Sequence, residues 1–152
     1  MRHWLMKSEP GEFSIDDLQR VTVEPWDGVR NYQARNFMRD AMRPGDPAFF
    51  YHSNCKTPGI VGVMKIAGRA YPDPTAFDPN DSHYDPKSDP DKPTWFLVDV
   101  RFVRKLKTPV TLERMKAETA LAGMRLLQRG NRLSVFPVDK LHWDHVLEMS
   151  QS

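Results

Sequence analysis

The sequence predicts an α+β fold in which a small bent sheet or barrel of about five strands is surrounded by short helices. Stretches of alternating apolar and polar residues recur along the chain, which is the pattern of half-buried strands. The helical stretches between them are short, and thirteen prolines stiffen the loops. Strands and helices do not alternate regularly, which disfavours a doubly wound parallel sheet.

Length and composition narrow the possible functions. A chain of 152 residues suffices for one domain with a genuine core, so residues 1–152 are expected to form a single domain. The net charge of +2 excludes a polybasic coat for nucleic acid and leaves only a local basic patch. A single cysteine, Cys55, excludes an internal disulfide. No signal-peptide pattern or membrane-spanning run is found, so we expect a cytoplasmic protein with no membrane partner.

The first half of the chain is expected to be mostly extended. Ser14 is placed to cap a short helix over residues 15–19. Alternation and aromatic content predict strands over residues 3–7, 47–52 and 60–69, with a short extended piece at 21–24. In the third strand, Gly62 and Gly68 are expected to mark bulges or sharp bends.

Residues 26–37 combine two large aromatics, two Arg-Asn pairs and one glycine in twelve positions. Gly28 takes a positive φ without strain, so a tight turn is expected before a helix that Asn31 caps. The apolar face of this helix, which ends near residue 43, consists of Ala34, Phe37, Met38 and Ala41. Asn31 and Arg35 lie on another face, close to a helix N-terminus that attracts negative groups.

The second half begins with a long loop, residues 71–93, in which four Asp-Pro pairs indicate turns. Tyr71, Phe77 and Tyr84 are expected to be buried and to order this loop as a lid. Further on, we expect strands over 95–104 and 132–136, the latter stopped by Pro137, and helices over 112–116, capped by Thr111, over 119–122, and after Asp139 as the final cap.

The aromatic and polar residues around position 30 suit a nucleobase. Trp26 and Tyr32 offer flat faces for stacking, and Asn31 offers an amide that reads a base edge. Arg35 supplies a cation for phosphate. The alternative is that Trp26 is an ordinary core anchor and that the arginines form an ordinary solvated face.

Other chemistry is poorly supported. Cys55 lies three residues after His52, but no third group is placed to orient a Cys-His pair. The same two residues lack the partners of a zinc site, and the Asp-rich loop lacks the spacing of a calcium loop. His83 is expected to be an ordinary loop residue. We therefore expect no catalytic residue, no metal and no cofactor.

Four sequence runs, supported by residues 71–77 and 95–99, closely resemble the EVE domain family of the PUA-like superfamily. The runs are residues 4–10, 26–36, 50–54 and 132–138. The resemblance covers almost the whole chain and implies a small PUA-like β-barrel of five to six strands with short peripheral helices. It further implies a pocket for a modified base in DNA or RNA, as in the related YTH readers, with no shared catalytic residues. No fused nuclease or helicase is recognised, so a protein partner acting in trans, such as a nuclease, is expected.

The residue pattern and the family resemblance together predict a non-catalytic reader, which binds a flipped-out or single-stranded modified base beside Trp26. The expected base-binding residues are Trp26, Asn31, Tyr32, Ser8, Asn54, His52, Ser53, Leu133 and Ser134. The expected phosphate-binding residues are Lys7, Arg30, Arg35 and Arg132. Two residues have alternative roles: Asn31 could be only a helix cap, and Arg30 only an internal ion-pair partner. Two other functions also stay open. One is an enzyme acting on a modified nucleotide or small metabolite through His52 and Glu9, and the other is a protein-interaction module with a vestigial cavity.

Overall fold

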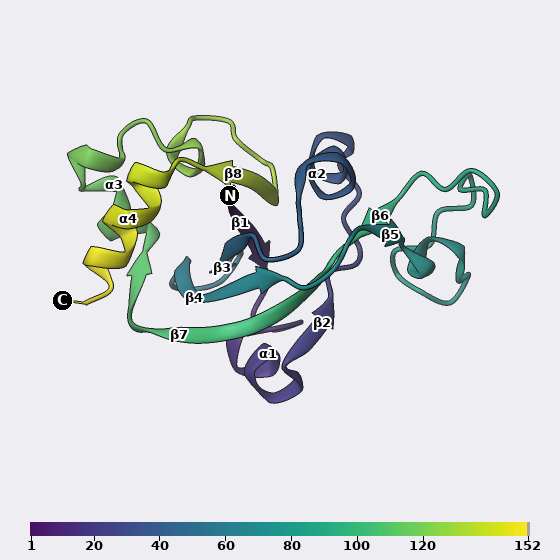
Figure 1. Ribbon diagram of the computed structural model, residues 1–152, viewed down its shortest axis with the longest axis horizontal. Coiled ribbons are helices and arrows are strands. Elements are labelled where there is room, and N and C mark those ends of the chain that lie inside the picture. Colours follow the sequence, from purple (N-terminus) through teal and green to yellow (C-terminus); the bar gives the residue numbers. More distant parts are fainter. Residues whose placement is uncertain (152) are drawn as a thin grey trace.

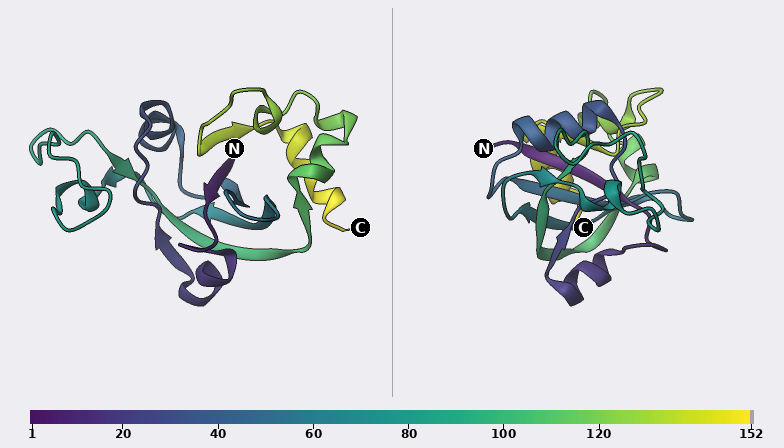
Figure 2. Two further views of the ribbon diagram at one scale, coloured as in Figure 1. Left: turned by 180° about the vertical axis from the view of Figure 1, so that it is seen from behind. Right: turned by 90° about the vertical axis from the view of Figure 1, so that its right-hand side faces the viewer.

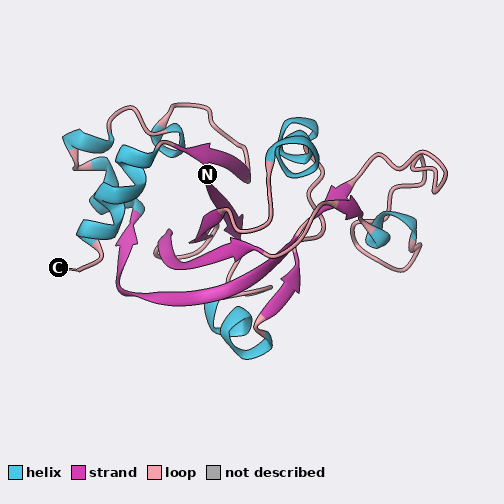
Figure 3. Ribbon diagram, viewed as in Figure 1, coloured by secondary structure: helices cyan, strands magenta, loops and turns pink. Residues whose placement is uncertain are grey.

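A computed structural model describes residues 1–151, and its main feature is one strongly curved six-stranded sheet (Figure 1). The strands are β1 (His3–Ser8), β2 (Val23–Pro25), β3 (Pro47–His52), β4 (Gly59–Ile66), β7 (Asp99–Thr111) and β8 (Val135–Val138), with β5 (Tyr71–Pro72) and β6 (Phe96–Leu97) forming a separate pair. The helices are short and surround this sheet (Figure 3). The expected bent sheet with peripheral helices is confirmed.

The helical elements alternate irregularly with the strands. The α-helices are α1 (Ile15–Val21), α2 (Tyr32–Asn36), α3 (Leu112–Lys116) and α4 (Lys140–Met149); α2 continues into the π-helix η1 (Phe37–Ala41), and the 3-10 helices are η2 (Pro74–Phe77), η3 (Thr119–Leu121) and η4 (Arg125–Leu127). The C-terminal helices lie at one end of the molecule and the loop around η2 at the other (Figures 1 and 2).

The sheet is an open, curled half-barrel with the strand order β2-β7-β4-β3-β1-β8. Neighbouring strands are antiparallel except β1 and β3, which run parallel. The long strand β7 bends along β4, where the register shifts between Ile60 and Gly62. The predicted bulge at Gly62 is thus confirmed. A side chain there would meet the Ile15 Cδ1 atom at 2.4 Å, so glycine lets α1 pack against the sheet.

Both faces of the central strands are buried, which explains their apolar sequences. On β1 and β3, Trp4 and Phe50 belong to one core and Leu5 and Phe49 to the other. In the second core the ring of Trp143 on α4 stacks on Phe49, with ring centroids 3.7 Å apart. The first core contains the residues around α1 and α2, and it supports the region described below as the candidate site.

Three of the four predicted side-chain caps are present. Ser14, Asn31 and Thr111 accept hydrogen bonds from backbone N–H groups at the starts of α1, α2 and α3. The prediction for Asp139 is wrong: it occupies the capping position of α4, but its side chain is exposed and makes no capping bond.

The strand predicted over residues 132–136 is displaced toward the C-terminus. β8 includes Pro137, which pairs with Trp4, so this proline does not end the strand. β8 is an edge strand with β1 as its one neighbour in the sheet. A proline is tolerated on an edge because its missing N–H is not needed on the open side.

The long loop is ordered, but not by buried tyrosines as expected, since Tyr71 and Tyr84 are each 40% exposed. Aspartate side chains fix its course instead. In each of five turns, the Oδ1 atom of an aspartate accepts a hydrogen bond from the backbone N–H two residues later, and these aspartates are Asp73, Asp78, Asp81, Asp85 and Asp89. Four of these five aspartates belong to the Asp-Pro pairs, so the turns predicted at those pairs are confirmed.

Candidate functional site

A hollow of about 580 Å³ lies beside the C-terminal end of β1. This volume falls within the usual range for small-molecule pockets, roughly 300–1,000 Å³. Its walls are formed by Lys7, Ser8, Glu9, Glu12, Phe13, Glu24, Pro25, Trp26, Asp27, Gly28, Val29, Arg30, Ser53, His83, Arg132 and Ser134. These residues come from five separate segments of the chain.

Strand pairing explains why the first of these segments meet. Because β1 and β3 run parallel, their C-terminal ends coincide, and the Ser53 N–H donates to the Ser8 carbonyl oxygen at 2.9 Å. β8 runs antiparallel to β1, so the chain entering β8 lies at the same place. There the Lys7 N–H donates to the Ser134 carbonyl oxygen at 2.8 Å. Four residues predicted to belong to the site are therefore brought together by the sheet.

Trp26 lines the hollow as a fixed wall. Its side chain is only 7% exposed, and its ring meets the Phe50 ring edge-on, with centroids 5.4 Å apart. Its backbone N–H donates to the Val98 carbonyl oxygen at 2.9 Å. We expected a partly uncovered ring, but most of it is covered by the core. The predicted neighbouring cavity is present, and Trp26 forms part of its lining.

Two acidic residues flank Trp26 in the wall of the hollow, and the sequence analysis overlooked both. Burial, followed by the nearby Asp27 charge, raises the pKa of the Glu24 carboxyl. Asp27 is exposed, but loss of hydration in the wall, followed by the charge of Asp73, raises the pKa of its carboxyl. The alternation of β2 could have located Glu24, since residues two apart in a strand point to the same side.

Two cations of the hollow remain available to a ligand. The Lys7 ammonium lies 5.9 Å from the ring centroid of Tyr51 and 5.7 Å from that of Phe136. Burial lowers the pKa of this lysine. Arg132 is exposed at the rim and makes no ion pair with another described residue.

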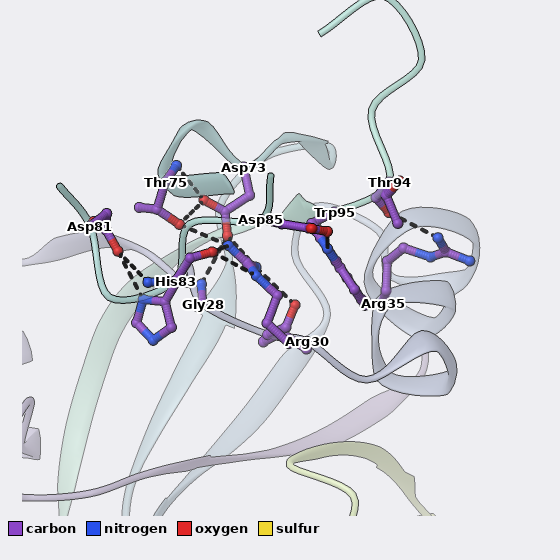
Figure 4. A network of polar contacts seen from close by, with 11 residues as sticks. Gly28, Arg30, Arg35, Asp73, Thr75, Asp81, His83, Asp85, Thr94 and Trp95 are labelled. Atoms are coloured by element: carbon purple, nitrogen blue, oxygen red, sulfur yellow. Dashed lines mark hydrogen bonds and ion pairs between the residues drawn. The ribbon is translucent and has the colours of Figure 1, made fainter. Parts of the chain in front are cut away.

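Arg30, expected to bind phosphate, is committed to the fold (Figure 4). Its Nη1 lies 3.0 Å from Oδ2 of Asp73, a fully buried carboxylate. The same guanidinium donates to the Thr75 hydroxyl and to the His83 carbonyl oxygen. Burial alone would raise the pKa of Asp73, but hydrogen bonds from Thr75, Gly28 and Arg30 outweigh it and leave this pKa lowered. The alternative role, an internal ion-pair partner, is the one that the geometry supports.

Gly28 is required where the long loop meets this wall. Its φ is +78°, and a Cβ atom there would lie 2.7 Å from the His83 imidazole. Its N–H donates to Oδ2 of Asp73 at 2.9 Å. The loop therefore places the His83 ring directly against Gly28, and both residues line the hollow. His83 is more than the ordinary loop residue that we expected.

Tyr32 and Arg35 belong to a different cluster and do not line the hollow. Tyr32 is 62% exposed and stacks on Trp95, with ring centroids 5.0 Å apart. The Arg35 guanidinium lies 5.0 Å from the Tyr32 ring centroid and donates to the Thr94 carbonyl oxygen at 2.8 Å (Figure 4). Tyr32 as a second wall of the pocket is therefore a wrong expectation, because its ring stacks on Trp95 outside the hollow.

The amides expected to read a base edge are engaged elsewhere. Asn31 Oδ1 accepts from the Ala34 N–H at 3.0 Å as the cap of α2. Asn54 is exposed, and its Nδ2 donates to Oε1 of Glu9 at 2.9 Å. Neither amide lines the hollow.

His52 and Leu133 also lie outside the lining. Nε2 of His52 accepts a hydrogen bond from the Ile15 N–H at 3.1 Å, which ties α1 to β3. Burial lowers the pKa of this histidine, consistent with a neutral ring. Leu133 packs against both cores. His52 and Glu9 therefore do not form a titratable pair in the hollow.

No group of three or more His, Cys, Asp or Glu side chains is arranged to hold a metal ion among residues 1–151. No helix in the same range has the length and apolar character needed to span a membrane.

The comparisons with known proteins agree over the whole chain. The family model described as EVE domain matches residues 2–149. Thymocyte nuclear protein 1 from Homo sapiens is 49% identical over 168 residues, covering 98% of this chain and 74% of that protein. A crystal structure of a Pseudomonas syringae protein is 50% identical, with a TM-score of 0.94 over 97% of this chain and 99% of that one.

Two solved complexes are also similar. Human THYN1 protein in complex with 5-methylcytosine containing DNA is 47% identical, with a TM-score of 0.95 over 100% of this chain and 99% of that one. The YTH domain of Zygosaccharomyces rouxii MRB1 protein, solved with N6-methyladenosine RNA, is 12% identical with a TM-score of 0.58, covering 98% of this chain and 86% of that one. The second likeness concerns the fold alone.

Proposed function

This chain belongs to the EVE domain family, and from that premise we propose that it is a reader of modified nucleobases in DNA or RNA. A flipped-out or single-stranded modified base enters the hollow beside Trp26, and no covalent step follows. The observation that carries this proposal is the cavity of about 580 Å³ bounded by that indole. The similar human protein, solved with 5-methylcytosine DNA, supports it.

The energetics suit a base that leaves its stack. Extrusion from a duplex costs a few kcal/mol, and contact with an aromatic side chain returns about 1–3 kcal/mol. Trp26 is held by Phe50 and by the core before any ligand arrives. A wall that is already ordered loses little conformational entropy on binding, which favours affinity.

Hydroxyl groups provide polar contacts to the base. The Ser8 hydroxyl donates to the Phe13 carbonyl oxygen at 2.6 Å, so its lone pairs stay free to accept a hydrogen bond. The hydroxyls of Ser53 and Ser134 make no hydrogen bond to another described residue. These three groups lie in the lining and replace the amides that sequence reasoning favoured.

Lys7 and Arg132 supply the positive charge that the backbone of a nucleic acid requires. Both line the hollow, whereas Arg30 is neutralised by Asp73. Each phosphate contact of this kind adds to the salt dependence of binding. The effect of binding on the nucleic acid is then delivered by a protein partner in trans, such as a nuclease.

The test compares matched tryptophan variants. Replacing Trp26 by alanine would open a core cavity and destabilise the protein by about 3–5 kcal/mol, so Trp26→Phe is the informative change. We expect it to weaken binding of a single-stranded 5-methylcytosine oligonucleotide about fivefold or more. Trp95→Phe is the control, since Trp95 is buried to nearly the same extent, 6% exposed against 7% for Trp26, but lies outside the lining. Equal affinities of the two variants would contradict the proposal.

A further inference from the structure

Glu24 and Asp27 are acidic groups without a partner, on either side of Trp26 in the wall of the hollow. Neither side chain makes a hydrogen bond or ion pair with another described residue. Glu24 is half-buried and Asp27 is exposed. The contrast with Asp73 is clear, because that carboxylate is fully buried and accepts from Arg30, Gly28 and Thr75.

The charges that face these two groups do not neutralise them. Asp27 and Asp17 act against ionisation of Glu24, and Arg20 acts for it. Around Asp27, the carboxylates of Asp73 and Asp81 oppose the weaker influence of His83 and Arg30. The net result in both cases is a raised pKa, led by burial. Such a carboxylate gains free energy when a ligand supplies N–H donors.

The chemistry of a nucleic acid limits which part of it faces these acids. Phosphate oxygens are repelled by a carboxylate, so Glu24 and Asp27 must face the base. Lys7 and Arg132 belong to the other segments of the lining, at the end of β1 and before β8. The hollow therefore has an acidic wall around Trp26, formed by Glu24 and Asp27. Lys7 and Arg132 lie across the sheet, where Glu9 and Glu12 also line the hollow.

We propose that Glu24 and Asp27 accept hydrogen bonds from the exocyclic amine of the bound base, so that the pocket selects amino bases and rejects keto bases. The preferred class contains modified cytosine or adenine, and the rejected class contains uracil and thymine. This inference rests on the proposed function. It adds to that function the part of the base that is recognised, namely the exocyclic amine.

An exocyclic amine matches two carboxylates because it presents two N–H donors and no acceptor at that atom. Carboxylate acceptance from a cytosine amine is a known mode of base readout. Thymine offers one ring N–H between two carbonyl oxygens, whose lone pairs would face the carboxylates. A site that pairs with the amine rejects the carbonyl analogue, since the half-buried Glu24 carboxylate is then left unpaired.

The closest chemical test uses 5-methylcytosine and thymine, which share the 5-methyl group and differ at position 4. Single-stranded DNA oligonucleotides with one such base in an otherwise identical sequence are titrated by fluorescence anisotropy. We expect the wild-type chain to bind the 5-methylcytosine strand at least about tenfold more tightly than the thymine strand. Glu24→Gln and Asp27→Asn should each reduce that ratio severalfold, because an amide also donates to a carbonyl oxygen.

Glu113→Gln is the matched control, since Glu113 is exposed on α3 and lies outside the hollow. It should keep the wild-type ratio. Circular dichroism establishes that each variant is folded before it is titrated. A wild-type ratio near one, or an unchanged ratio in both pocket variants, would overturn the inference and leave the proposed function standing.

The proposed function has its own readout in the same titration. A third strand carries unmodified cytosine, and preference for 5-methylcytosine over cytosine tests whether a modification is read at all. If the chain binds none of the three strands, both proposals are overturned together. If it binds cytosine and 5-methylcytosine equally but rejects thymine, amine readout stands and recognition of this methyl group is excluded.

Discussion

The Arg30 guanidinium lies 3.0 Å from the fully buried Asp73 carboxylate and connects the turn after Trp26 to the long loop. Arg30 also holds the carbonyl oxygen of His83, so it fixes the part of the loop that reaches the hollow. A residue that resembles a phosphate ligand in the sequence is thus a structural support of the pocket wall.

The main effect of removing Arg30 should therefore be a loss of protein stability, and its effect on base recognition should be smaller. Arg30→Met leaves Asp73 buried without its cation, and a broken buried pair costs about 3–5 kcal/mol. Chemical denaturation in urea measures this change. Arg39→Met is the control, because Arg39 pairs with the exposed Asp40 and a solvated surface pair contributes little to stability. Similar losses in the two variants would contradict the structural role of Arg30.

The acidic wall should contribute less to the stability of the protein at neutral pH than in mild acid. Folding raises the pKa of Glu24 and Asp27, so the folded state binds protons more tightly than the unfolded state. The free energy of unfolding contributed by these groups is highest below their ordinary pKa values of 4.5 and 3.8 and falls as pH rises through the raised values.

Replacing either carboxylate by an amide should remove that loss of stability at neutral pH. Glu24→Gln and Asp27→Asn are each expected to raise the Tm at neutral pH by up to about 2 °C, with no gain near pH 3. Thermal melts at both pH values measure the difference. Asp73→Asn should behave in the opposite way, since its lowered pKa stabilises the fold above its ordinary value of 3.8. A gain for the wall variants that is equal at both pH values would exclude the electrostatic cause.

Gly28→Ala should not only strain the backbone but also disturb the wall of the pocket. The new methyl group would meet the His83 ring at 2.7 Å, so the loop must move. Gly130→Ala is a close control, because its φ of +79° nearly equals the +78° of Gly28 and no atom lies within 4 Å. Strain alone costs about 1–2 kcal/mol in either variant.

We expect Gly28→Ala to be the more destabilising change and to lose oligonucleotide affinity, with both effects partly restored by adding His83→Ala. Urea denaturation and anisotropy titration provide the two readouts. Equal destabilisation by Gly28→Ala and Gly130→Ala would show that the contact with His83 does not matter.

Of the two arginines Arg132 and Arg35, both expected from the sequence to bind phosphate, only Arg132 should contribute to the salt dependence of binding. Arg132 is exposed at the rim of the hollow, while Arg35 is held by Tyr32 and Thr94 outside it. Arg132→Ala should weaken binding of modified and unmodified strands alike and reduce the slope of log affinity against log salt by about one. Arg35→Ala should leave the slope unchanged, and the reverse result would restore the original assignment.

Local signals in the sequence predicted local structure well. Ser14, Asn31 and Thr111 cap helices because capping needs only a side chain and the backbone three residues on. The Asp-Pro turns follow from equally local hydrogen bonds. The prediction that Pro137 ends a strand was wrong because a proline is tolerated in an edge strand. Which strand lies at the edge is a property of the whole sheet.

Trp26 was predicted from the aromatic and polar residues around it, and the other lining residues were predicted only where the family resemblance placed them. Lys7, Ser8, Ser53 and Ser134 meet because parallel and antiparallel strands end at one place. Long-range contacts decided the rest: Tyr32 stacks on a ring 63 positions away, which no local pattern indicates.

The proposed place of the modified base, in the hollow beside Trp26, can be tested directly through the indole N–H groups. The four tryptophans give four indole N–H signals in a proton–nitrogen NMR spectrum, which Trp→Phe variants assign. Titration with a 5-methylcytosine oligonucleotide should shift the Trp26 signal strongly and leave those of Trp4 and Trp143 in place, with at most a small change at Trp95. A large shift of Trp95 with an unmoved Trp26 would contradict the account and place the ligand on the Tyr32 cluster instead.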